Sequence, residues 1–303
     1  MVMATNGNTP YDHITNAIIA ALEAGNVVWH KPWKVRKPCN AITGKAYRGI
    51  NPFLLMLAGD YTDHRWLTFK QAQELGGTVK KGEKATWIVF SSPNTKTDDD
   101  GKVVSRYWIM RAYKVFNVEQ CENLTKLAPL EECPNQDADP DILAEAIWAK
   151  YADAPNVKTG GSVASYSPSL DVINMPTRGD FESNAHYYAT LFHEGIHSTG
   201  HKDRLARKSL MESDGFGGYV YSLEELVAEF GSAFLVAEAG MDAPTRENTV
   251  AYLQGWIQKL KDDHTLVVKA ASQAQTAADY ILGVKAKDEP TTAEVETVEA
   301  VAV

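Results

Sequence analysis

Hydrophobic and polar positions in the first 120 residues follow both the helical and the strand period. Ile14, Ile18 and Leu22 recur at helical spacing, and Thr68 is placed to cap a later helix. Two apolar runs rich in aromatic and β-branched residues flank a polar segment, residues 91–102, which reads as a hairpin loop. Helices are thus expected over residues 11–22, 52–57 and 69–75, and strands over residues 85–90 and 103–116. These patterns predict a small α+β domain over residues 10–121.

The pattern after residue 140 is mainly helical. Amphipathic segments predict helices over residues 142–151, 183–200, 222–235, 252–260 and 267–282. Two short strands are expected around a turn in residues 163–176, and Pro168 and Pro176 keep them at the edge of a sheet. An edge strand beside a functional helix is a suitable place to hold an extended peptide. Residues 141–284 are therefore expected to form a mainly helical domain with a small edge sheet.

Two segments lack this periodicity. Residues 122–140 are rich in Glu, Asp, Asn and Pro and are expected to be a linker. Residues 285–303 are acidic and contain no aromatic side chain, so they are expected to be a disordered tail. The whole pattern predicts an α+β protein of two domains.

Charge divides along the same boundary. Residues 1–120 carry 16 basic and 10 acidic side chains, whereas the rest of the chain carries 14 basic and 29 acidic ones. A basic first part joined to an acidic second part indicates different partners for the two domains. Cys39, Cys121 and Cys133 form no paired pattern, and no apolar run approaches the ~20 residues that span a bilayer. The N-terminus lacks the apolar core of a signal peptide, so a cytoplasmic protein without a membrane partner is expected.

One pentapeptide in the second domain carries a specific chemical signal: His193-Glu194-Gly195-Ile196-His197, of the form H-E-x-x-H. Residues four apart lie on one face of a helix, where two imidazoles bind one zinc ion through neutral nitrogens. The neighbouring carboxylate of Glu194 then reaches a metal-bound water and takes its proton as general base. Gly195 weakens a helix by roughly 0.5–1 kcal/mol relative to alanine, and close backbone packing is a reason to keep it.

A catalytic zinc needs a third protein ligand as well as an open position. His201 is a poor candidate, because it lies a further turn along and the order His-x-x-Gly-His departs from the metzincin pattern. Glu225 and Glu229 lie four residues apart on the apolar-striped helix predicted at residues 222–235. One of them is expected to ligate the metal while the other hydrogen-bonds a ligating histidine. Ser222 and Glu225 also match a capping box, so the order of the two glutamates stays open. The two helices together predict a zincin-like metallopeptidase domain.

The first domain interleaves aromatic and basic residues. Bases stack on aromatic faces while Lys and Arg neutralise phosphates, so this composition favours single-stranded DNA as a partner. For each aromatic residue a place in the core is an equal alternative, and for Trp87 the core is favoured. The residues expected to contact DNA are Trp33, Lys34, Lys45, Tyr47, Arg48, Trp66, Lys80, Lys81 and Lys84.

Several motifs together resemble the ArdC-type plasmid antirestriction proteins over about residues 10 to 284. The second domain contributes the H-E-x-x-H motif with Gly200-His201, then Arg204-Leu205 and the acidic run 224–229. The first contributes Asn40-x-x-Thr43-Gly44-Lys45-x-Tyr47-Arg48-Gly49-x-Asn51, then Arg65-Trp66-x-Thr68 and Gly76-Gly77-x-Val79-x-Lys81-Gly82-Glu83-Lys84. The resemblance implies an N-terminal single-stranded-DNA-binding domain, adds Asn51 to its expected site, and implies a C-terminal domain similar to DNA-associated metalloproteases. It also implies that the protein protects incoming conjugative plasmid DNA from host restriction.

Three functions stay open at this point. The leading hypothesis is an antirestriction protein that binds single-stranded DNA and carries a zinc-peptidase site, with a protein substrate such as a component of the restriction system. Zn²⁺ is the expected cofactor and Mn²⁺ a second candidate. The second hypothesis is a DNA-binding protein whose zincin domain is a non-catalytic interaction module. The third is a peptidase unconnected with DNA.

Overall fold

The computed structural model of the 303-residue chain describes residues 9–30, 36–97, 103–130, 138–212, 218–242 and 250–284. It is a two-domain α+β protein, as the sequence predicts. In the first part the elements are α1 (Pro10–Glu23), η1 (Val28–His30), β1 (Cys39–Asn40), α2 (Asn51–Leu57), β2 (Arg65–Leu67), α3 (Phe69–Glu74), β3 (Thr78–Val79), β4 (Thr86–Thr97), β5 (Val103–Asn117), η2 (Val118–Gln120) and β6 (Cys121–Glu122). In the second part they are α4 (Pro140–Ala149), β7 (Asn156–Thr159), β8 (Ser165–Ser167), β9 (Val172–Met175), η3 (Arg178–Asp180), α5 (Asn184–Thr199), α6 (Lys208–Met211), α7 (Tyr219–Glu238), α8 (Val250–Asp262) and α9 (Leu266–Ile281).

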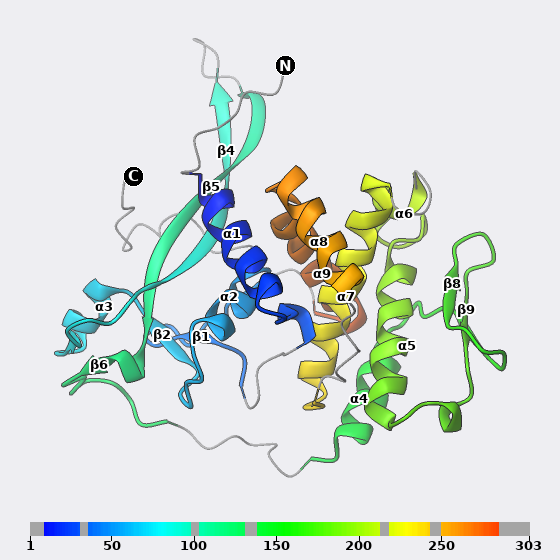
Figure 1. Ribbon diagram of the computed structural model, residues 1–303, viewed down its shortest axis with the longest axis horizontal. Helices are drawn as coiled ribbons and strands as arrows, with labels where there is room; N and C mark the ends of the chain where they lie inside the picture. The colour runs from blue at the N-terminus through cyan, green and yellow to red at the C-terminus, as the bar shows by residue number, and fades with distance from the viewer. Residues whose placement is uncertain are drawn as a thin grey trace.

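The first part is built on a four-stranded sheet of order β1-β2-β5-β4, in which β1 and β2 are parallel and the other pairs antiparallel. The long β4–β5 hairpin stands on the side of the molecule opposite β8 and β9, with α1 and α2 between (Figure 1). The predicted loop at residues 91–102 is partly wrong, because β4 continues to Thr97 and pairs with β5 throughout. The side chains of residues 91–97 are mostly polar, so apolar periodicity does not detect the backbone hydrogen bonds that pair them with β5.

Helix α1 ties the start of the chain to its end. A capping box between Thr9 and Asp12 begins the helix. Asp12 also accepts a hydrogen bond from Nδ1 of His264 at 2.5 Å, and the hydroxyl of Thr15 donates to the carbonyl of His264 at 2.6 Å. The hydrogen bond from the Thr9 hydroxyl lowers the pKa of Asp12 to about 2, with His264 adding to the effect against the opposing influence of burial. These contacts hold α1 against the connection between α8 and α9.

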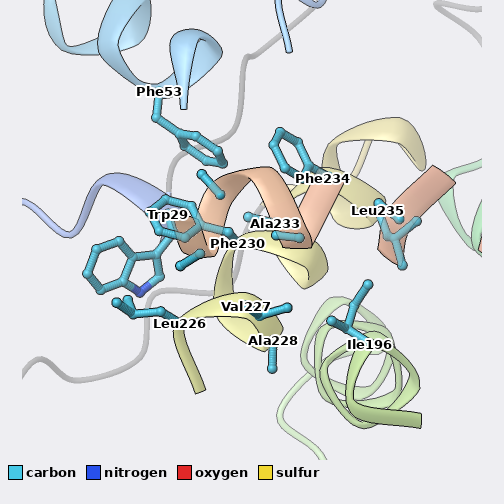
Figure 2. Packing of buried hydrophobic residues seen from close by; sticks show 14 of the residues in the cluster. Trp29, Phe53, Ile196, Leu226, Val227, Ala228, Phe230, Ala233, Phe234 and Leu235 are labelled. Carbon is cyan, nitrogen blue, oxygen red and sulfur yellow. The ribbon is translucent and has the colours of Figure 1, made fainter. Parts of the chain in front are cut away.

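The largest hydrophobic core contains residues from both parts of the chain. Trp29 and Phe53 pack edge-on against Phe230 of α7, with ring centroids 5.2 and 4.8 Å apart. Figure 2 shows these rings together with Phe234, on the side of α7 away from Ile196. Burial of such aromatic surface contributes strongly to stability. The same core contains Ile14 and Ile18 of α1, so α1 and α2 are joined to α7 by packing and not only by the connecting segment.

The predicted helices of the second part are confirmed, and a small sheet accompanies them. Its order is β7-β9-β8, with β7 parallel and β8 antiparallel to the central strand. β8 and β9 correspond to the predicted strands, and β8 lies at an edge as expected. The expected edge position is wrong for β9, because β7 pairs along its other side and makes it the central strand. Strand β7 was not predicted, because its residues are mostly exposed and show no apolar alternation. β8 and β9 lie beside α5 (Figure 1).

The segment expected as a linker is not uniform. β6 pairs with β3, and the amide of Lys126 donates to the carbonyl of Leu75 at 3.0 Å, so its first residues pack on the sheet domain. Residues 131–137 and the expected acidic tail, residues 285–303, lie outside the described part of the chain. Cys39 and Cys121 are buried free thiols. None of the helices in the described residues is long and apolar enough to cross a membrane.

Candidate metal centre

The H-E-x-x-H motif lies in the last two turns of α5. Ser183 caps this helix by accepting a hydrogen bond from the amide of His186, and the helix ends at Gly200, in agreement with the range 183–200 expected from the sequence. Fully buried Phe192 and Ile196 fix the helix against the core, so His193 and His197 lie together on the adjoining face. Both imidazoles are themselves largely buried.

Gly195 allows α5 to lie close to its neighbours. A Cβ at this position would meet the indole of Trp148 at 2.7 Å, which is closer than real Cβ atoms approach. The prediction that close packing requires this glycine is therefore confirmed. Trp148 belongs to α4, so the constraint fixes the motif helix against the first helix of the second part.

Helix α7 brings one carboxylate to the two histidines. The Nε2 atoms of His193 and His197 lie 3.2 Å apart, and the carboxylate oxygens of Glu225 lie 3.7 and 3.6 Å from them. Ligand bonds of ~2.0–2.2 Å arranged tetrahedrally place neighbouring ligand atoms about 3.3–3.6 Å apart. The three side chains therefore match the separations and the donor set that a divalent metal requires. Among the His, Cys, Asp and Glu side chains of the described residues, these three have ligand atoms that all lie within 4.8 Å of one another.

The structure distinguishes between Glu225 and Glu229, the two candidates for the third ligand. Glu229 lies one turn further along α7, where it faces the hydroxyl of Tyr252 at 3.5 Å, and it is not part of the converging group. The expected capping box is wrong. Helix α7 begins at Tyr219, so Ser222 lies inside the helix and its hydroxyl donates to the carbonyl of Gly218 at 2.6 Å. Glu225 is thereby left without the capping role.

The carboxylate that hydrogen-bonds His197 belongs to Glu224, which was not among the site residues predicted from the sequence. Glu224 is 4% exposed, and its Oε1 lies 3.1 Å from Nδ1 of His197. This contact occupies the ring nitrogen opposite Nε2 and turns Nε2 toward His193 and Glu225. The expected support from Glu225 or Glu229 is thus replaced by a residue one position before Glu225. Glu224 directly precedes Glu225 in the sequence. The four-residue spacing of Glu225 and Glu229, however, predicted that one of these two would support the histidine.

Electrostatics around His197 follow from this contact. Burial of Glu224 by itself raises the pKa of its carboxyl, but hydrogen bonds from His197 and Arg207 outweigh burial and lower it to about 2. Burial likewise acts to lower the pKa of His197, and the hydrogen bond and charge of Glu224, with the charges of Glu225 and Glu194, raise it instead. Glu194, the residue after His193 in α5, is itself largely buried.

Comparison with known proteins agrees with the two halves of this description. Residues 8–116 match the family described as the N-terminal domain of anti-restriction factor ArdC, and residues 144–273 match the zincin-like metallopeptidase family. Crystal structures of the antirestriction protein ArdC from plasmid R388, one metal-free and one Mn(II)-bound, superpose with a TM-score of 0.71 each. They are 38% and 37% identical to this chain, cover 89% and 92% of it, and are themselves covered over 96% and 99% of their length. The chain belongs to the ArdC antirestriction family.

Three further proteins are similar to this chain. An uncharacterized protein, y4eC of Sinorhizobium fredii (strain NBRC 101917 / NGR234), is 33% identical over 89% of this chain and 91% of its own length. Two proteins named DNA primase TraC, from Escherichia coli, are each 36% identical over 91% of this chain. The chain spans only 20% and 27% of those two proteins, so the ArdC-like region is one segment of much longer relatives.

Three of the residues expected to contact DNA in the ArdC-type first domain are buried. Tyr47 is 5% exposed and Trp66 is 3% exposed, and both belong to the core beneath the sheet. Asn51 is 4% exposed and bonds both backbone groups of Val89, at 2.7 and 2.8 Å. These positions correct the expectation: two rings pack in the core and the amide fixes β4. None of the three presents a face to nucleic acid.

The charged members of the expected set lie at the surface. Lys45, Lys80, Lys81 and Lys84 are exposed, and the last three cluster in the turn between β3 and β4. The Lys80 ammonium donates to the carbonyl of Glu119 at 2.7 Å. Arg48 is half exposed, and its guanidinium pairs with Asp279 of α9. Trp33 and Lys34 lie outside the described residues.

Proposed function

We propose that this chain is an antirestriction protein that binds single-stranded DNA with its first domain, residues 10–121, and carries a metal-dependent peptidase site in its second, residues 141–284. The observation that carries the proposal is the convergence of His193, His197 and Glu225, with His197 fixed by Glu224. An imidazole held from its far nitrogen by a carboxylate is typical of a metal ligand. Membership of the ArdC family supports the antirestriction role.

Each residue of the site has a distinct task in this proposal. His193, His197 and Glu225 hold the cation, which when bound acts as a Lewis acid toward water and a peptide carbonyl. Glu194 accepts a proton from the attacking water on its carboxylate and later delivers that proton to the leaving amine nitrogen. The edge strand β8, beside α5, offers backbone groups to an extended peptide. The substrate is a protein, with a component of the host restriction system as the leading candidate.

Zn²⁺ is the proposed physiological metal. Two imidazole nitrogens and one carboxylate, with a remaining open position, form a donor set that zinc uses in catalytic sites. Mn²⁺ is the second candidate, and a related ArdC protein was crystallised with Mn(II). Imidazole and carboxylate ligands bind both ions, so the choice in cells depends on their availability.

The proposed DNA contact uses charge more than stacking. The exposed lysines of the β3–β4 turn, with Lys45, neutralise backbone phosphates without reading sequence. Such binding suits a cytoplasmic protein that meets incoming single-stranded plasmid DNA before host restriction enzymes act on it. The burial of Tyr47 and Trp66 removes two of the expected stacking rings.

Glu194→Gln tests the catalytic part of the proposal. The variant keeps the size of the side chain but loses the base, so it is expected to bind metal and DNA normally while losing proteolysis and antirestriction. Glu229→Gln is the matched control, because this carboxylate lies on the neighbouring helix outside the converging group. If Glu194→Gln protects DNA as well as the wild type, the second domain serves as a non-catalytic interaction module and the enzymatic proposal is wrong.

A further inference from the structure

A buried arginine lies behind the metal centre. It has no hydrogen bond to the three converging side chains, although its Nη2 donates to the backbone carbonyl of His197 at 3.4 Å. Arg207 is largely buried, just before α6, and its guanidinium meets the carboxylate of Glu224 side-on. Nε donates to Oε2 at 3.1 Å and Nη2 donates to Oε1 at 2.6 Å. This bidentate geometry fixes both the position and the plane of a carboxylate, which a lysine does not achieve.

The remaining acceptor sites of Glu224 are also filled. Oε1 accepts from Nδ1 of His197 at 3.1 Å, and Oε2 accepts from the hydroxyl of Ser209 at 2.6 Å. A carboxylate offers about four lone-pair directions, so four donors leave it no alternative orientation. The carboxylate that supports His197 is thus held rigidly by Arg207 and Ser209.

Arg207 also binds the end of the motif helix directly. Nη2 donates to the carbonyl of Ile196 at 2.8 Å, and Nη1 donates to the hydroxyl of Thr199 at 2.5 Å. Carbonyls in the last turn of a helix lack intrahelical partners, and a cation there is further stabilised by the helix dipole. One guanidinium therefore fixes both the backbone that carries His197 and the carboxylate that orients its ring.

Gly200 makes room for this arrangement. A Cβ at residue 200 would lie 2.9 Å from Nη2 and 3.0 Å from Cζ of Arg207, well inside ordinary contact distance. Any side chain at this position requires the guanidinium, and Leu210 beside it at 3.0 Å, to shift. The geometry explains why a glycine follows the motif at this point.

We propose that Arg207 is a positioning residue for metal binding, acting through Glu224 and the carboxyl end of α5 to hold Nε2 of His197 toward His193 and Glu225. The inference rests on the proposed metal centre and adds a residue that the converging group does not contain. Loss of support behind a ligating histidine lowers metal affinity roughly ten- to hundredfold in comparable sites.

Arg207→Lys tests the proposal, with Arg204→Lys as the matched control. Arg204 is equally buried, pairs in bidentate fashion with Asp171 at 2.8 Å, and donates to the carbonyl of Ser198. It does not contact Glu224, so a general effect of losing a buried guanidinium is shared by both variants. Zn²⁺ and Mn²⁺ affinities are measured by competition with a chromophoric chelator on the full chain, and the melting temperature is measured on metal-free protein.

The proposal predicts a roughly ten- to hundredfold weaker affinity for Arg207→Lys and unchanged affinity for Arg204→Lys, whatever the two melting temperatures. Equal affinities in both variants and the wild type would overturn the inference while leaving the metal centre intact. A wild-type chain that binds neither ion would overturn the proposed metal centre itself. If Arg207→Lys fails to fold, Ser209→Ala is the second variant, because it removes a single hydrogen bond to Glu224. It is expected to weaken metal binding by a smaller factor than Arg207→Lys. Unchanged metal affinity in Ser209→Ala would count equally against the inference.

Discussion

Replacing Gly231 by alanine tests how closely the two helices of the metal centre are packed. Gly231 lies in α7, and a Cβ there would meet the Cδ1, Cγ1 and Cγ2 atoms of Ile196 at 2.6, 2.7 and 2.9 Å. Ile196 is fully buried inside the motif of α5, and as a β-branched residue in a helix it has essentially one χ1 rotamer. The added methyl group must therefore push the helices apart rather than displace a flexible side chain.

The expected loss of stability follows from two opposing effects. Overpacking in a well-packed core costs about 1–3 kcal/mol. Replacing a glycine inside a helix by alanine stabilises the folded state by about 0.5–1 kcal/mol. The net destabilisation of Gly231→Ala is therefore about 0–2.5 kcal/mol, and a central value of about 1 kcal/mol lowers the melting temperature by about 2–4 °C for a protein of this size. Because α5 carries the histidines and α7 carries Glu225, metal affinity is expected to fall as well.

Urea and thermal unfolding of metal-free protein, followed by circular dichroism, measure this effect. Gly255→Ala is the matched control, because a Cβ at this exposed position in α8 meets no heavy atom within 4 Å. It is expected to stabilise the protein by about 0.5–1 kcal/mol. Ile196→Ala removes the opposing side chain, so the double variant Ile196→Ala/Gly231→Ala is expected to be more stable than the sum of the single effects predicts. Additive effects, or stabilisation by Gly231→Ala, would refute the close-packing argument.

Three further predictions concern the rest of the fold and the DNA contact. Asp12 stabilises the folded state above its unfolded pKa of about 4, and this contribution is lost as pH falls from there toward 2. Asp12→Asn should therefore lower the free energy of unfolding by about 2 kcal/mol from pH 7 down to about pH 5 and by progressively less below that, and a difference that stays constant down to about pH 2 would contradict this. Asn51→Ala should lower the free energy of unfolding by about 2–5 kcal/mol, because both backbone groups of Val89 lose their buried partner; a loss below 1 kcal/mol would show that water replaces the amide. Lys81→Gln/Lys84→Gln should make the plot of log binding constant for an oligonucleotide against log salt shallower by about 1.4, since each phosphate contact on a single strand contributes about 0.7; an unchanged slope would place the DNA elsewhere.

Local patterns in the sequence were sufficient for most of the helices. The α5 and α9 boundaries agree with prediction within a residue or two, since capping residues and helical periodicity are local signals. Strand β7 and the outer half of β4 were missed because they are held by backbone pairing and carry polar side chains. The packing of the first helices onto the core around Phe230 depends on contacts between residues far apart in the sequence, such as Trp29 and Phe53 with Phe230, which periodicity does not encode.

The metal centre was predictable in part for a similar reason. The spacing of His193 and His197 lies within one helix and is readable from five residues. The choice between Glu225 and Glu229 depends on how α7 is rotated against α5, and so does the contact of Glu224 with His197. The residue types of Tyr47 and Trp66 were equally compatible with stacking on DNA and with burial in the core. The fold places both rings in the core.

We propose that His193, His197 and Glu225 bind a single divalent metal ion. Calorimetric titration of metal-free protein with Zn²⁺ and with Mn²⁺ measures this binding in the wild type, in Glu225→Gln and in Glu229→Gln. We expect one ion bound per chain, a marked loss of affinity in Glu225→Gln, and unchanged binding in Glu229→Gln. Retention of metal by Glu225→Gln together with its loss from Glu229→Gln would show that Glu229, and not Glu225, is the third ligand.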